Sequence, residues 1–153
     1  HYFKSKEVFG AEMLVRYFAH YVAQLQAWLN KPGRTARDSL VDYFRRWASH
    51  EGGNCEQACL AVKLSGEVSD LSEVMREALA AGMRDVEQAL AAGIASGQAD
   101  GSLDPELRPG ELAAGLYTLW VGAELMAKVQ RSSTPLQQAL RQTDTMLQPA
   151  RAR

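Results

Sequence analysis

The sequence predicts an all-α protein of six helices in one domain, and three observations lead to that prediction. Apolar residues recur every three or four positions along most of the chain, which is the spacing of one helical face. Clusters of Gly, Pro, Asn and Asp divide these stretches in the way that helix boundaries do. No segment alternates apolar and polar residues as a half-buried strand does.

Composition narrows the class of protein further. With 153 residues, 46% of them hydrophobic and 23% charged, the chain can bury a core without cross-links and is typical of a globular domain. Seventeen basic against eighteen acidic residues give a net charge of −1, so no basic footprint for nucleic acid is present. We expect no transmembrane span and no secretion leader, and two cysteines separated by three residues favour a reducing cytoplasm over a disulfide framework.

The first three predicted helices occupy the first half of the chain. Ser5 is the expected N-cap of a long helix that ends in the turn at 30–33. A second helix begins at Thr35, whose spacing to Asp38 resembles a capping box, and a short third helix covers 59–68. The apolar face of the first helix consists of Leu14, Tyr17, Phe18, Tyr21, Val22, Leu25, Trp28 and Leu29, and that of the second of Leu40, Tyr43, Phe44 and Trp47.

The other three helices follow a second cap. Asp70, with Glu73 at the reciprocal position, is expected to start a long fourth helix that stops at Gly97. The fifth runs from Pro109 to about residue 131, and the sixth opens at Thr134, which we expect to be its N-cap. The buried positions expected on the fourth helix are Leu71, Met75, Leu79, Val86, Leu90 and Ile94, and those on the sixth are Leu136, Leu140, Met146 and Leu147.

The predicted fifth helix is apolar on nearly all sides, with small residues at Ala113, Gly115, Gly122 and Ala123. Such a helix has to be buried on most of its faces. We therefore expect a homodimer in which the last two helices form a four-helix bundle with their symmetry mates. The alternative is that these helices fill the core of a monomer.

Covalent reactivity is concentrated in one short segment, where a Gly-rich stretch at 52–54 precedes Cys55 and Cys59. Buried free cysteines usually behave as small hydrophobes. Close to a helix start, however, the helix dipole stabilises a thiolate and lowers the pKa of the thiol. A thiol–disulfide switch between the two cysteines and a metal site with His50 are further alternatives, although zinc usually needs a fourth ligand.

Several stretches resemble TetR-family repressors. Residues 1–7 (HYFKSKE) resemble the end of that family's DNA-reading head and the start of its connecting helix. The stretches at 9–14, 59–73 and 119–128 resemble the branch of the family that senses electrophiles and oxidants. The resemblance divides the chain into residues 1–4, the end of a helix-turn-helix head that is missing here, and residues 5–153, a sensing and dimerisation domain.

What this resemblance implies is a cytoplasmic, homodimeric transcriptional repressor that releases operator DNA when a small electrophile or oxidant modifies a cysteine. Cys59 matches the sensing cysteine and Lys128 a lysine that neighbours it, while Cys55 has no counterpart and Ala58 replaces a glycine. The family's regulatory cavity and its phosphate contacts imply further candidates, which are Tyr17, Tyr117 and Trp120 for the ligand pocket and His1, Tyr2, Lys4 and Lys6 for DNA phosphates.

The sequence contains no signature of catalysis. We find no paired carboxylates, no phosphate-binding loop and no nucleophile with a matched base, and we expect no cofactor and no metal. Two other functions stay open: a TetR-type repressor induced by a non-covalent hydrophobic ligand, and a helical interaction domain whose cysteines are structural.

Overall fold

The computed structural model describes residues 2–49 and 72–152, and within these ranges the chain forms five α-helices and no strand. The all-α prediction is confirmed for this part of the chain. The short helix predicted at 59–68 lies outside the described residues. The helices are α1 (Tyr2–Leu29), α2 (Ala36–Ser49), α4 (Glu73–Ala99), α5 (Pro109–Gln130) and α6 (Thr134–Met146).

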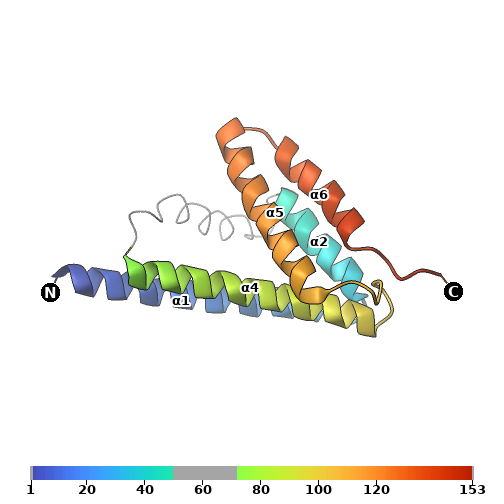
Figure 1. Cartoon of the computed structure of the whole chain (residues 1–153), viewed down its shortest axis with the longest axis horizontal. Coiled ribbons are helices and arrows are strands. Elements are labelled where there is room, and N and C mark those ends of the chain that lie inside the picture. Colours follow the sequence, from blue (N-terminus) through green and yellow to red (C-terminus); the bar gives the residue numbers. More distant parts are fainter. Residues whose placement is uncertain (1, 50–71, 153) are drawn as a thin grey trace.

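The helices form two groups (Figure 1). The long helices α1 and α4 lie side by side and run in the same direction, while α2, α5 and α6 form a second group inclined to that pair. Glycines on both helices lie where α1 and α4 pack closely. A Cβ at Gly82 would lie 2.0 Å from the Phe18 ring, and one at Gly10 would lie 2.9 Å from the end of Met75.

The core lies where the two groups meet, and it contains the predicted apolar faces. All four expected positions of α2 are buried, and so are the expected positions of α1 apart from Tyr17, Val22 and Trp28, which are partly buried. The least exposed large side chains are Trp47, Trp120, Phe44, Leu40, Leu90, Ile94, Leu103, Leu116, Leu136 and Leu147.

Three predicted N-caps were wrong, those at Ser5, Asp70 and Thr134. Helix α1 begins at Tyr2, so its backbone is already helical at Ser5 and that residue does not cap it. The cap of α4 is Ser72 rather than Asp70, and its hydroxyl accepts a hydrogen bond from the Met75 N–H at 3.3 Å. The prediction for Thr35 is confirmed, since its hydroxyl accepts from the Asp38 N–H at 3.1 Å.

Two further boundaries differ from the prediction. Helix α4 continues through Gly97 to Ala99, because this glycine serves packing rather than termination: a Cβ there would lie 2.5 Å from Leu103. Helix α6 is capped by Ser133, so Thr134 is its first helical residue instead of its cap. Such shifts of one or two residues are ordinary at helix ends.

The connection from α4 to α5 holds the start of α2 in place. Asp100 accepts a hydrogen bond from the Ala36 N–H at 2.8 Å, and Arg37 donates from Nε to the carbonyl of Leu147 at 2.8 Å. Hydrogen bonds from Ser102 and from the Ala36 N–H hold the pKa of Asp100 below its usual value. The start of α2 is thus tied to the ends of α4 and α6.

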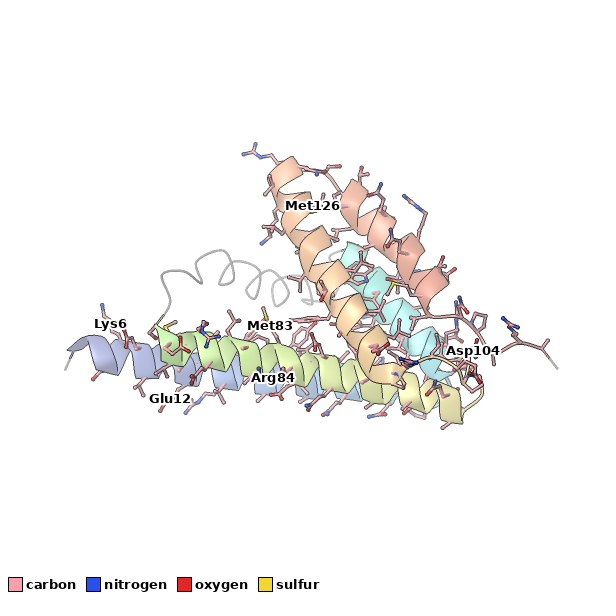
Figure 2. The ribbon with its side chains drawn as sticks, viewed as in Figure 1. Lys6, Glu12, Met83, Arg84, Asp104 and Met126 are labelled. Atoms are coloured by element: carbon pink, nitrogen blue, oxygen red, sulfur yellow. The ribbon has the colours of Figure 1, made fainter. Side chains whose placement is uncertain are left out.

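Helix α5 carries apolar residues on its outer face as well as its inner one. By length and composition alone it could cross a membrane, although charged residues interrupt it. In this structure it packs against α4 and α6. Its large outward apolar side chains are Leu125, Met126 and Val129, with exposed fractions of 49%, 51% and 76%. Figure 2 labels Met126 in the upper part of α5, towards its C-terminal end.

Candidate functional site

The segment with the two predicted sensor cysteines follows directly on α2 in the sequence. Cys55, Cys59 and His50 lie outside the residues that the structure describes, so the predicted sensing, disulfide and metal roles remain predictions. The described structure does fix the two ends of this segment. Helix α2 ends at Ser49, and Ser72 caps the start of α4.

Lys128, the predicted neighbour of Cys59, lies exposed in the last turn of α5. It lines an open cavity of about 390 Å³ at the junction of α5 and α6. The helix ends there because Arg131 adopts a left-handed backbone conformation and its N–H reaches the carbonyls of Ala127 and Lys128. The residues lining this cavity, called below the α5–α6 cavity, are Glu124, Ala127, Lys128, Arg131, Ser132, Ser133 and Leu136.

Glu124 is the residue that the sequence reasoning missed. Its side chain is fully buried one turn before Lys128, and its Oε2 accepts a hydrogen bond from Trp47 Nε1 at 3.1 Å. Taking an ionised carboxylate out of water costs several kcal/mol, so buried carboxylates need hydrogen-bond donors around them. The signal in the sequence is an acidic residue inside an otherwise apolar helical stretch, flanked by Ala123 and Leu125.

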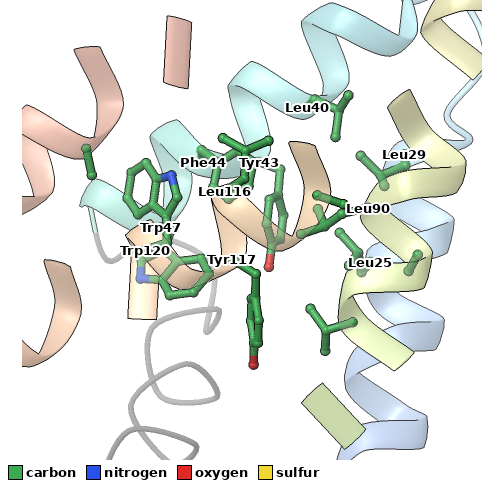
Figure 3. Packing of buried hydrophobic residues seen from close by; sticks show 14 of the residues in the cluster. Leu25, Leu29, Leu40, Tyr43, Phe44, Trp47, Leu90, Leu116, Tyr117 and Trp120 are labelled. Atoms are coloured by element: carbon green, nitrogen blue, oxygen red, sulfur yellow. The ribbon is translucent and has the colours of Figure 1, made fainter. Parts of the chain in front are cut away.

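Trp47 belongs to an aromatic cluster that joins α2 to α5 (Figure 3). Its ring centroid lies 5.4 Å from that of Trp120 and 6.3 Å from that of Phe44. Trp120, a predicted pocket residue, is fully buried, stacks on Phe44 and donates from Nε1 to the Thr143 hydroxyl at 2.8 Å. A ligand that contacts the Trp120 ring therefore has to displace core side chains.

The two other pocket candidates are tyrosines beside the same core. Tyr117 is nearly buried, and desolvation together with the charge of Glu87 raises its pKa to about 12. Tyr17 is half-buried and stacks on Tyr21 at 6.4 Å. The hydroxyls of Tyr21 and Tyr43 are hydrogen-bonded to each other, and burial raises the pKa of both. The structure brings Tyr17 and Tyr117 to one tyrosine-rich part of the core without showing a ligand there.

Comparison with known proteins identifies the family. Residues 35–143 match the family model described as "Tetracyclin repressor-like, C-terminal domain". The chain is 40% identical over 142 residues to the HTH-type transcriptional repressor NemR of Escherichia coli (strain K12). The aligned region covers 92% of this chain and 71% of NemR. The chain is 32% identical over 139 residues to the HTH-type transcriptional repressor DhaR of Mycobacterium sp. (strain GP1), which covers 91% of this chain and 69% of DhaR.

The chain belongs to the TetR family of transcriptional repressors.

Solved TetR-family structures agree with the fold described above. The crystal structure of the reduced form of E. coli NemR superimposes with a TM-score of 0.87 and 39% identity, covering 99% of this chain and 79% of that one. A putative transcriptional regulator of the TetR/AcrR family gives a TM-score of 0.80 and 37% identity, covering 96% of this chain and 77% of that one. Its TetR-family relatives are repressors, so the prediction that the chain is not an enzyme is confirmed.

The predicted phosphate-contacting residues map to the first turns of α1 in this TetR-family chain. Tyr2, Lys4 and Lys6 belong to the helix itself, while His1 lies outside the described residues. Figure 2 shows Lys6 near the N-terminal end of α1, far from α2 and α6. Their contacts with DNA remain a prediction.

Proposed function

We propose that this TetR-family chain is the regulatory part of a repressor that senses electrophiles or oxidants through Cys59 and releases operator DNA when that thiol is modified. The observation that carries the proposal is the position of Lys128. Its amine lies at an open cavity on α5, next to a buried carboxylate, where it is accessible to a reagent or to a modified thiol. A nearby ammonium group lowers the pKa of a thiol and makes the reactive thiolate more abundant.

Residues 1–4 belong, in this proposal, to the end of a DNA-binding head, and residues 5–153 form the sensing and dimerisation domain. The continuous helix α1 joins them, because it runs from Tyr2 along the whole length of its contact with α4. His1, Tyr2, Lys4 and Lys6 contact DNA phosphates at the head end of this helix. A change in the packing of α1 on α4 therefore changes the position of the heads on successive half-sites.

The mechanism is a shift between two populations. Modification of Cys59 stabilises a helix arrangement in which the two heads of the dimer no longer fit their half-sites. A coupling free energy of about 1–3 kcal/mol, which is typical of allosteric proteins, lowers operator affinity by roughly 5–150-fold. Where an oxidant such as hypochlorite converts the Cys59 thiol to a sulfenic acid, the Cys55 thiolate attacks that sulfur, a disulfide forms and water leaves.

The proposed repressor is a cytoplasmic homodimer. The outer face of α5 exposes three large apolar side chains, Leu125, Met126 and Val129, and such a patch on a helix needs a partner surface. A second copy of the same chain provides one, with α5 and α6 of each protomer forming a four-helix bundle.

The test uses the full-length protein and its operator. Cys59→Ser should abolish the loss of operator affinity on treatment with N-ethylmaleimide or hypochlorite, whereas Cys55→Ser should retain it for N-ethylmaleimide. Intact mass measures the modification in the same samples. Operator release by the Cys59→Ser variant as complete as that of the unsubstituted protein rejects the proposal. Release without any mass change would favour a non-covalent ligand instead.

A further inference from the structure

We infer that Glu124 is a positioning residue of the proposed sensor, whose carboxylate holds Trp47, and with it the end of α2, against α5. This inference rests on the function proposed above. Glu124 has no exposed surface and Trp47 is 2% exposed, so water does not compete for the 3.1 Å hydrogen bond between Nε1 and Oε2. A hydrogen bond is electrostatically stronger in such surroundings than at the surface.

The position of Trp47 makes this contact relevant to the sensor segment. Trp47 lies two residues before Ser49, the last residue of α2, and the chain passes from there into the segment that contains Cys55 and Cys59. Its ring is fixed from two sides, by Phe44 of the same helix and by Trp120 of α5. The packing of Trp47 therefore fixes the position of the last turn of α2, from which the chain continues towards the two cysteines.

Glu124 also borders the place where the proposed chemistry occurs. It lines the α5–α6 cavity together with Lys128, which follows it by one helical turn. Because residues four apart lie on the same face of a helix, a change of packing at Lys128 acts on the neighbouring Glu124 side chain. That carboxylate in turn holds Trp47. The pair thus connects the cavity to the end of α2.

A purely stabilising role does not explain why a carboxylate occupies this position. Buried ionic groups are weak contributors to stability, and apolar side chains of similar volume often serve as well or better. Leu at position 124 together with Phe at position 47 would remove both polar atoms of the hydrogen bond between these two residues. The carboxylate is therefore better explained by what it positions.

The experiment compares four variants of the full-length protein: Glu124→Gln, Glu124→Leu, Trp47→Phe and the double variant Trp47→Phe/Glu124→Leu. For each variant, the operator Kd is measured before and after N-ethylmaleimide treatment, with the extent of modification matched by intact mass. The release ratio is the Kd after treatment divided by the Kd before it. Glu124→Gln keeps an oxygen acceptor, so its release ratio should lie within about twofold of that of the unsubstituted protein. The two other single variants should reduce the ratio by about fivefold or more, the lower end of typical allosteric coupling.

The double variant and the indole resonances separate positioning from a general loss of structure. The double variant should lose no more than the more strongly affected single variant, because both substitutions break the same Trp47–Glu124 hydrogen bond. Each of the three tryptophans in these 153 residues gives an indole N–H signal in NMR spectra, and the loss of one signal in Trp47→Phe assigns that of Trp47. The Trp47 signal should move on modification, whereas that of Trp28, which donates to the Ser39 carbonyl at 3.2 Å, should not.

The outcomes distinguish this inference from the function it rests on. An undiminished ratio in Glu124→Leu, or a Trp47 signal that does not move on modification, overturns the role of Glu124. If the Cys59→Ser variant is still released from the operator, Cys59 is not the sensing thiol. The comparison of Glu124→Leu with the unsubstituted protein then still decides the role of Glu124. If the reagent fails to release the unsubstituted protein from its operator, both are wrong.

Discussion

Gly82→Ala should destabilise the domain, because Gly82 lies on α4 where α1 approaches most closely. The added Cβ would lie 2.0 Å from Phe18 Cδ2 and 2.2 Å from Cγ, whereas ordinary contact begins at 3.4 Å. The Phe18 side chain is 3% exposed and packs in the core, so its ring has little room to retreat. The two helices would have to separate.

The magnitude follows from two opposing effects. Overpacking a core typically costs about 1–3 kcal/mol and occasionally more. Replacing a helical glycine by alanine stabilises the helix by about 1 kcal/mol. Since a whole ring has to move, we expect the steric cost to fall in the upper part of its range. Gly82→Ala should therefore lower the free energy of unfolding by about 1–2 kcal/mol.

Urea unfolding at fixed protein concentration measures this loss, since a slope of about 1–3 kcal/mol per molar converts it into a lower midpoint. The matched control is Gly10→Ala on α1. Its Cβ would meet only the flexible end of Met75, at 2.9 Å, so we expect a neutral or slightly stabilising effect. In the Gly82→Ala background, Phe18→Leu should cost less than it does alone. Equal midpoints for Gly82→Ala and the unsubstituted chain would refute the reasoning.

The remaining predictions concern pH and assembly. Tyr117 has a folded pKa of about 12 against an ordinary value near 10, so its contribution to stability is complete below about pH 10 and is lost as the pH rises through about 12. Tyr117→Phe should therefore lose less stability than the unsubstituted chain over this range, as urea midpoints would show; equal losses would contradict the assigned pKa. Val129→Lys places a charge on the outer face of α5, where the side chain is 76% exposed, and should shift the proposed dimer towards monomer in sedimentation equilibrium, while Gln130→Lys should not. A Val129→Lys variant that stays dimeric would locate the interface elsewhere.

Periodicity in the sequence was sufficient to predict most of the fold. The buried faces of α1, α2 and α6 follow from apolar spacing because burial on one side of a helix leaves that pattern in any sequence. The cap at Thr35 and the proline at the start of α5 could be predicted because these signals act within one helical turn. The predictions at Ser5 and Gly97 were wrong: α1 is already helical from Tyr2, and Gly97 lies inside α4, where Leu103 needs the space.

Some features of the candidate site could likewise be predicted from the sequence, whereas others depend on the tertiary structure. The sequence by itself determined the helical class and the apolar surplus of α5, because these depend on residue type and local spacing. The roles of Cys59 and Lys128 were predicted from the family resemblance and stay predictions. Only the tertiary structure placed Glu124 against Trp47, since the two residues lie 77 positions apart in the chain. It also decided that Trp120 is a core residue stacked on Phe44. Contacts between distant segments arise from how helices pack, and no local pattern records them.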